Sequence, residues 1–234
     1  MNTKSQDMGS IELSDASKLN PSRGGMCAVV SVILALWFAL VLVLGAQGAF
    51  RGGVDSPPLP IFFGFGIPLV VFFAAYFGWS AFRAYVLGAD LRLVTALQAW
   101  RWAGLGFLAD YAHGILPWQF ALPAGLGDMA IGVTAPWIVL RLIRQPSYAA
   151  SRRYVIWNAL GILDLIVAVT MGAICSGFFF HNFTGSVTTG PMAQLPLVLI
   201  PAYFVPIFIM LHFTALAQSR QLARSGQTDT AKNF

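Results

Sequence analysis

Residues 26–46 read MCAVVSVILALWFALVLVLGA, a run without a charged side chain. An α-helix rises 1.5 Å per residue, so about 20 apolar residues cross the roughly 30 Å hydrocarbon core of a bilayer. The run is longer than the apolar core of a signal peptide, and no small-residue cleavage site joins it to a polar mature domain. We therefore expect a retained membrane span, preceded at residues 1–25 by a disordered cytosolic tail.

The whole chain shares this apolar character. Its 234 residues are 57% hydrophobic and 10% charged, and the mean hydropathy is +0.71. Soluble domains carry about 25% charged residues, so the composition excludes a soluble enzyme, a disordered protein and a nucleic-acid-binding module. The net charge of +5 has an ordinary origin, because Lys and Arg accumulate in the cytoplasmic loops of multi-span proteins. The expected partner is the lipid bilayer, and no nucleic acid is expected.

Further apolar runs of span length follow the first. The six expected spans are 26–46, 60–82, 93–116, 120–140, 154–174 and 195–217. Pro117 disfavours helical geometry in the residue before it, which predicts a tight hairpin at residues 116–119, between the third and fourth spans. The predicted fold is an all-α integral membrane protein, with a six-transmembrane-helix bundle at residues 26–217 and a short cytosolic tail at 218–234.

The distribution of basic residues predicts the orientation of these spans. Arg51 is alone in the segments that would lie outside, whereas twelve Lys and Arg residues fall in the segments that would lie inside. The twelve are Lys4, Lys18, Arg23, Arg83, Arg92, Arg141, Arg144, Arg152, Arg153, Arg220, Arg224 and Lys232. By the positive-inside rule, both termini are expected in the cytoplasm. The short loops favour a bacterial inner membrane.

Polar side chains inside the expected spans form a candidate substrate- or ion-binding site. Its members are Arg101, Asp128, Asn158, Asp164 and His212, which come from the third, fourth, fifth and sixth spans. Because a charge in hydrocarbon is costly, each should face the bundle interior and find a partner. Both acids lie about 12–15 Å from a membrane surface, near the midplane. Pairing Arg101 with Asp128 or Asp164 leaves one negative charge, which must take a proton or a cation.

The two acids are also expected to lie on packing faces. They stand at the centres of two helical stripes of small residues: Ala121, Gly125, Asp128, Gly132 and Ala135 in one, and Asn158, Gly161, Asp164, Ala168 and Gly172 in the other. Small residues let membrane helices approach closely, so these faces should meet other helices rather than lipid. The same pattern also occurs where polar residues only hold a bundle together, and this structural interpretation stays open.

A second candidate site lies near the outer surface. Asp110 and His113 are three residues apart at the end of the third span, and His181 in the outer loop could join them. Zinc requires three or four ligands in a fixed geometry, which nothing in the sequence provides, so no metal is expected. A haem held by two histidines needs both at one depth, but His113 is outer and His212 inner. No cofactor is therefore expected.

The function that these residues favour is transport or channel activity. In this hypothesis a small solute, a cation or a proton occupies Asp128 and Asp164, and Arg101 supplies the counter-charge. Alternatively, the protein is a non-catalytic subunit of a membrane complex or a homo-oligomer. In that case the stripes of small residues serve as docking surfaces.

A short motif suggests an enzyme instead. Residues 125–128 read GLGD, which resembles the GxGD motif of presenilin-type and prepilin-peptidase-type intramembrane aspartyl proteases. The resemblance implies a pair of membrane aspartates that share a proton, with Asp128 as one and Asp110 or Asp164 as the other. The chain departs from these families because Asp110 follows an alanine rather than a tyrosine, and no lysine follows Asp128.

Overall fold

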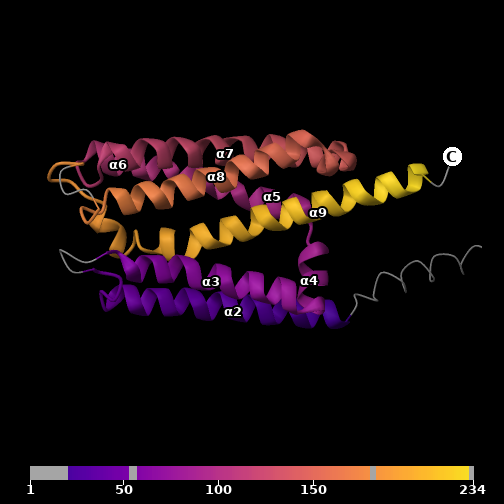
Figure 1. Ribbon diagram of the computed structural model, residues 1–234, viewed down its shortest axis with the longest axis horizontal. Coiled ribbons are helices and arrows are strands. Elements are labelled where there is room, and N and C mark those ends of the chain that lie inside the picture. Colours follow the sequence, from indigo (N-terminus) through magenta and orange to yellow (C-terminus); the bar gives the residue numbers. More distant parts are fainter. Residues whose placement is uncertain (1–20, 53–56, 180–182, 232–234) are drawn as a thin grey trace, which may run out of the picture. The chain divides into compact units, whose positions relative to one another are not determined.

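The computed structural model describes residues 21–52, 57–179 and 183–231, and this part consists of helices joined by turns and loops, with no strand (Figure 1). Contacts divide the chain into two units, residues 1–39 and 40–234. The first unit contains the beginning of helix α2 (Pro21–Ala46), whose last residues belong to the second. Every residue of the candidate sites lies in the second unit.

Among the described residues, five helices are long and apolar enough to cross a membrane. They are residues Gly24–Ala46 of α2, α3 (Leu59–Gly78), α7 (Trp118–Arg144), α8 (Arg152–Ile174) and Ile200–Arg224, which combines a π-helical turn, Ile200–Phe204, with most of α9 (Val205–Ala231). These five correspond to the first, second, fourth, fifth and sixth expected spans. Helices of this length and composition make the chain a membrane-embedded protein.

The third expected span, 93–116, is not one continuous α-helix. It consists of α5 (Leu91–Leu97), a 3₁₀-helix η1 (Gln98–Gly104) and α6 (Leu105–Ala112). Runs of 3₁₀-helix beyond three or four residues are uncommon, and within a longer helix they often mark a functional or strained position. The predicted count of six spans is therefore not confirmed: the described residues contain five helices that are long and apolar enough to cross a membrane.

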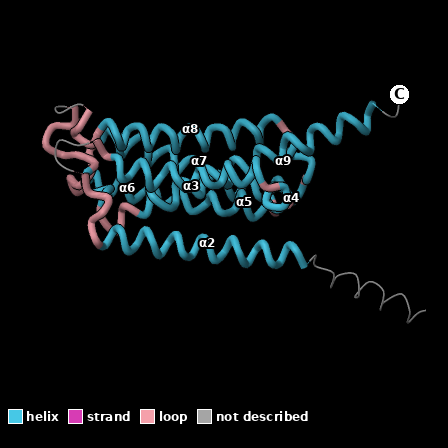
Figure 2. The backbone as a smooth tube through the Cα atoms, turned by 60° about the horizontal axis from the view of Figure 1, so that its bottom comes forward, coloured by secondary structure: helices cyan, strands magenta, loops and turns pink. Residues whose placement is uncertain are grey.

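Helices α7 and α9 organise the second unit. Helix α7 packs against α5, η1 and α6 along one side and against α8, while α9 packs against α8, α5 and α3. Figures 1 and 2 show α3, α7, α8 and α9 running along one another, with α4 (Ser80–Leu87) at one end. The hydrophobic clusters of this unit lie between these helices, and one of them joins Leu165 of α8 to Val205 and Ile209 of α9.

The two ends of this unit differ in charge. Helix α4, the end of α7, the start of α8 and the end of α9 meet at one end (Figure 1), which we call the basic end. It carries Arg83, Arg92, Arg141, Arg144, Arg152, Arg153, Arg220 and Arg224. The opposite end, which we call the loop end, holds the described residues that follow α2, among them Arg51, and those between α8 and α9, residues 175–179 and 183–199. The cytoplasmic placement of the termini stays a prediction.

A tight connection joins α6 to α7, where the sequence predicts a hairpin. Gly114 has a φ of 72°, a left-handed conformation that glycine adopts without strain. Its N–H donates to Tyr111 O at 2.9 Å, and the Ile115 N–H donates to Asp110 O at 2.8 Å. This pair of hydrogen bonds is a Schellman motif, which ends α6 and satisfies its last carbonyls. Pro117 then immediately precedes α7.

The last helix is longer than the last expected span. Helix α9 continues to Ala231, through most of the segment expected as a tail at 218–234. Gln218 is buried, and its side-chain amide donates to the carbonyl oxygens of Val86 and Ala89, at 3.0 Å each. These hydrogen bonds fix α9 to the end of α4. The tail expected at 1–25 lies mostly outside the described residues, and the domain limits stay predictions.

Candidate functional site

The side chain of Arg101 lies at the centre of a polar cluster inside the second unit. Its exposed fraction is 0%. Nε donates to Asp128 Oδ1 at 2.7 Å, and Nη2 donates to the carboxylate of Asp164. Nη1 lies 3.2 Å from Gly161 O and 3.0 Å from His212 Nε2. Thus a single guanidinium from η1 binds one acid on α7, one acid on α8 and a histidine on α9.

Both acids therefore pair with Arg101, although the sequence predicts a partnership with either one. The guanidinium contributes one positive charge and the two carboxylates two negative charges. The side chains of Asp128 and Asp164 are 13% and 15% exposed, so the acids form the accessible side of the cluster. Within the described chain, each acid keeps one oxygen that accepts no hydrogen bond. Such an arrangement can hold one further positive charge.

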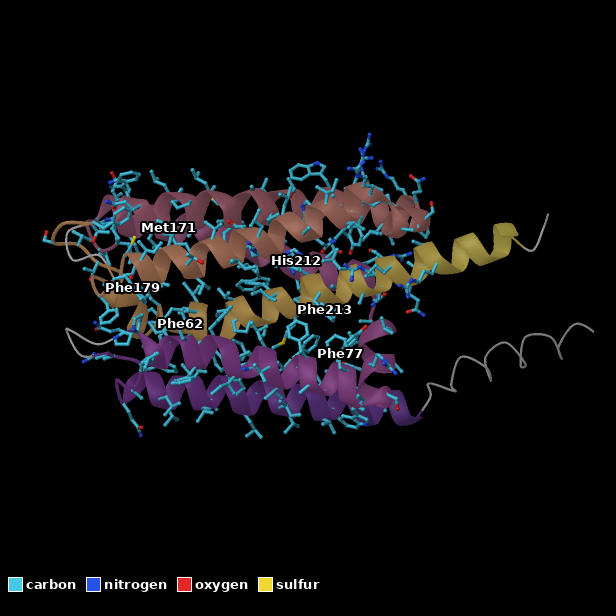
Figure 3. The ribbon with its side chains drawn as sticks, viewed as in Figure 1. Phe62, Phe77, Met171, Phe179, His212 and Phe213 are labelled. Carbon is cyan, nitrogen blue, oxygen red and sulfur yellow. The ribbon has the colours of Figure 1, made fainter. Side chains whose placement is uncertain are left out.

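His212 is held as a neutral imidazole by its two neighbours. Asn158 Nδ2 donates to Tyr154 O at 2.9 Å, which leaves Asn158 Oδ1 facing His212 Nδ1 at 2.9 Å. An amide oxygen only accepts, so Nδ1 carries the proton and Nε2 carries the lone pair. That lone pair accepts the hydrogen of Arg101 Nη1. His212 therefore holds the guanidinium in place, and Figure 3 shows it on α9 where this helix passes α8.

Glycines provide the room for this cluster. A Cβ atom on Gly161 would overlap the imidazole of His212, and one on Gly127 would overlap the carboxylate of Asp164. On the other side of α7, a Cβ on Gly132 would lie 2.7 Å from the carbonyl carbon of Arg101. The small-residue stripes predict close packing at Gly161 and Gly132. Gly127 lies outside these stripes and belongs to the GLGD sequence, whose resemblance to the GxGD motif implies close approach to the helix.

A cavity of about 580 Å³ reaches the cluster from the loop end. Asp128 contributes to its lining, and Arg51 lies among the loop residues that also line it. Asp128 is ten residues into α7 from Trp118, which places it about 15 Å from that end of the helix. Six phenylalanines contribute to the remaining, largely apolar lining: Phe50, Phe62, Phe65, Phe107, Phe120 and Phe178. The cavity thus combines an apolar wall with a carboxylate at depth.

Irregular helix geometry lies against the same cavity. Pro68, Pro201 and Pro206 lie within apolar runs, and each lacks the backbone N–H that a helix uses; Pro206 is the second residue of α9. Pro68 is inside the continuous helix α3, whereas Pro201 belongs to the π-helical turn before α9. Pro201 and Val205 line the cavity. Single π-turns inside helices are frequent at functional sites.

The loop between α8 and α9 packs back onto the bundle at the mouth of this cavity. The Thr189 hydroxyl donates to Gly172 O at 2.6 Å, and the Thr189 N–H donates to Cys175 O at 3.0 Å. Met192 and Ala193 are buried. The loop therefore contributes a wall to the cavity.

The second candidate site is not assembled within the described residues. His113 caps α6, and its Nδ1 lies 2.8 Å from Ala109 O, four residues earlier. This ring therefore bonds to its own helix rather than to Asp110. His181 lies outside the described residues. Among the residues that the structure describes, no group of three or more His, Cys, Asp or Glu could hold a metal ion.

Two polar residues near the basic end were not singled out from the sequence. The hydroxyl groups of Thr95 and Tyr154 lie 2.9 Å apart, and both residues are buried. The backbone oxygen of Tyr154 receives the Asn158 amide, so this pair lies next to the residues that hold His212. Neither residue is ionised near neutral pH, so charged residues within apolar runs do not point to this pair.

A family model matches residues 58–220, which include α3, the whole polar cluster and the cavity-lining residues from Pro58 onwards. The chain belongs to the family described as Domain of unknown function (DUF8737). No curated protein and no solved structure matches it. All of α2 lies before the matched region, whereas the polar cluster lies inside it.

Proposed function

We propose that this protein binds a small cationic solute or a proton at Asp128 and Asp164 and passes it across the membrane, as a transporter or channel-like protein. The observation that supports this most directly is the position of Asp128. It pairs with Arg101 on one side and lines a cavity of about 580 Å³ on the other. An ion pair that only held helices together would not need an open space against its acid.

The charge of the cluster supports a cationic ligand. Two carboxylates share one guanidinium, and His212 is neutral, so the cluster has one negative charge to spare when both acids are ionised. In a medium of low dielectric constant, an uncompensated charge is costly. A cation or a proton that reaches Asp128 removes this cost. Arg101 then serves as a permanent internal counter-charge, which offsets the repulsion between the two acids when no ligand is bound.

Two residues act by positioning in this proposal. Asn158 fixes the tautomer of His212, and His212 accepts a hydrogen from Arg101 Nη1. Together they leave Nε and Nη2 directed at the two acids. The π-helical turn at Ile200–Phe204 is the element that we expect to move, because it lines the cavity and is joined directly to the helix that carries His212.

We place the basic end in the cytoplasm of a bacterial inner membrane, following the positive-inside rule. The cavity then opens to the outer side, and the solute enters from there. Homo-oligomers or complexes with other membrane proteins are compatible with this orientation, because the proposed site lies within one chain.

Charge movement in proteoliposomes tests the proposal. The protein is reconstituted on a solid-supported membrane and exposed to jumps in Na⁺, K⁺ and proton concentration and to an organic ammonium ion, 4-phenylbutylammonium. We expect a transient current for at least one of these cations. Asp128→Asn and Asp164→Asn should abolish it, whereas Asp110→Asn, at an acid outside the cluster, should preserve it. If both cluster variants fold and give the same currents as the parent, the proposal is wrong.

An intramembrane aspartyl protease is a second candidate, because one feature favours it. Asp128 of the GLGD sequence and Asp164 come together, and Gly127 allows the Asp164 carboxylate to approach α7 closely. The geometry supports this function less well than transport. Each acid binds the guanidinium of Arg101, whereas a catalytic pair of aspartates shares a proton directly. Cleavage of a labelled membrane peptide that is lost in Asp128→Asn would favour the protease.

A further inference from the structure

We infer that the cavity takes an amphiphilic organic monocation: an ammonium group that pairs with Asp128, carried on an apolar, preferably aromatic, body that fills the space toward the loop end. This inference deepens the proposed function and rests on it. It names the class of solute, which the acid cluster by itself does not determine.

The size of the cavity is the first reason. A bare metal ion or a proton needs only a few oxygen ligands or a hydrogen-bonded path. A volume of about 580 Å³ lies within the range of roughly 300–1,000 Å³ that is typical of pockets for drug-sized organic ligands. The space next to Asp128 therefore fits an organic molecule with a charged end.

The lining is the second reason. Phe107 and Phe120 pack edge to face with ring centroids 5.2 Å apart, and both line the cavity together with Asp128. Phe62 contributes from α3, and Figure 3 shows it between α3 and the segment that precedes α9. Aromatic faces attract both apolar groups and ammonium ions. An apolar body with a cationic end satisfies the wall and the acid at the same time.

The order of charges along the cavity gives the ligand its direction. Arg51 lies at the loop end, where its side chain donates to Gln194 Oε1 at 3.3 Å. This positive charge is exposed to solvent. Solvent and salt screen an exposed charge, so Arg51 does not prevent the entry of a cation. The deep charge, at Asp128, is screened much less. We therefore place the ammonium group at the deep end and the apolar body toward the mouth.

Three probes with the same apolar body test this inference. They are 4-phenylbutylamine, which is cationic at neutral pH, neutral 4-phenylbutanol and anionic 4-phenylbutyrate. Binding to the full-length protein in lipid nanodiscs is measured by calorimetry. We expect the amine to bind about tenfold more tightly than the alcohol, and the butyrate not to exceed the alcohol, because the deep charge is a carboxylate. Equal binding of all three probes, or preference for the butyrate, would overturn the inference.

Variants of the protein test where the two ends of the ligand bind: the ammonium group at Asp128 and the apolar body at Phe62. Asp128→Asn should reduce the affinity for the amine about tenfold, to that of the alcohol, and Asp110→Asn should leave it unchanged. Phe62→Ala should weaken the amine and the alcohol alike, by about fivefold. Phe63→Ala is its matched control, because Phe63 is the next residue on α3, is 59% exposed and does not line the cavity. Equal effects of Phe62→Ala and Phe63→Ala would contradict the aromatic site.

The outcomes separate this inference from the function on which it rests. The protein could give currents for Na⁺, K⁺ or protons that require Asp128 and yet show no selective binding of the amine. This result would contradict the inferred class of solute but would agree with the proposed function. Selective binding of the amine that persists in Asp128→Asn would overturn the placement of the ammonium group. Loss of amine binding in folded Asp128→Asn, with currents for the amine in the parent, supports both.

Discussion

Gly127 of α7 and Asp164 of α8 face each other so closely that a methyl group on the glycine would occupy the position of the carboxylate. The acid can reach Arg101 only because no side chain stands there. We predict that Gly127→Ala displaces Asp164 and lowers the free energy of unfolding by about 1–3 kcal/mol, the usual cost of overpacking. Thermal unfolding in detergent, followed by tryptophan fluorescence, measures this loss.

Gly66→Ala is the matched control for that prediction. Gly66 lies inside α3, and a Cβ there meets nothing within 4 Å. Alanine is also the better helix former, so this change should leave the stability unchanged or raise it slightly. If Gly127→Ala melts at the same temperature as the parent, α7 and α8 can move apart without loss of stability. The close approach at Gly127 then does not contribute to stability.

A second prediction concerns the guanidinium. Arg101→Gln leaves two acids together in the membrane without their counter-charge, and breaking a buried ion pair from one side costs about 3–5 kcal/mol. We expect a large loss of folded protein by size-exclusion chromatography. Adding Asp128→Asn and Asp164→Asn to the same chain should restore much of it, because no ionised acid then remains. Arg92→Gln, at an exposed arginine of the basic end, should have no such effect.

The sequence predicted which residues belong to this site, but not all of the contacts between their side chains. An arginine and two acids inside apolar runs are conspicuous, since charges are rare there. The sequence did not indicate that Arg101 binds both acids, nor that it also meets His212. Those contacts depend on the depth and rotation at which η1 passes α7, α8 and α9, and on the room left by Gly161. Periodicity within one helix contains no information about the register between helices.

Five of the expected spans were predictable for a simple reason. Each is a long apolar run, and length and hydropathy alone suffice in a bilayer. The run at 93–116 has the same composition, yet it contains a seven-residue 3₁₀-helix. The 3₁₀ segment packs closely against Gly125 and Gly132 of α7, and the composition of the run does not reveal such a tertiary contact.

The tautomer of His212 gives a third prediction. Because Nδ1 faces the Asn158 oxygen and Nε2 faces Arg101, the ring should be neutral and protonated on Nδ1 at pH 7. Nitrogen-15 NMR of protein labelled at histidine distinguishes the two neutral tautomers and the imidazolium ion. The signal that disappears in His212→Gln identifies the residue. Detection of a proton on Nε2 would contradict the proposed hydrogen bonds.

The buried thiol at the loop end gives a prediction about reactivity. Burial raises the pKa of Cys175 above that of an ordinary cysteine, so the reactive thiolate is scarcer at pH 7.5. In a Cys27→Ser background, N-ethylmaleimide should label the folded protein far more slowly than the unfolded protein. Raising the pH increases the thiolate fraction and should speed labelling.

Thr189 provides the corresponding test of the loop. Its hydroxyl fixes the loop to Gly172 O, so Thr189→Val should loosen this wall of the cavity and speed the labelling of Cys175. Ser186→Ala, at an exposed position of the same loop, should leave the rate of Cys175 labelling unchanged. Rapid labelling in the parent protein would mean that Cys175 is accessible, and that the loop does not cover it.

The last prediction compares two glycines two residues apart. A Cβ on Gly104 would lie 2.5 Å from Asp128 Cβ and 2.9 Å from Gly125 O, whereas a Cβ on Gly106 meets nothing within 4 Å. Gly104→Ala should therefore force η1 away from α7, and with it the guanidinium of Arg101 away from Asp128. We expect it to destabilise the protein by about 1–3 kcal/mol and to abolish cation currents, while Gly106→Ala preserves both. Both substitutions add the same methyl group, one at the end of η1 and one at the start of α6, so a difference between them reports the packing of Gly104 against α7. Identical behaviour of the two variants would show that the 3₁₀ segment does not position the arginine.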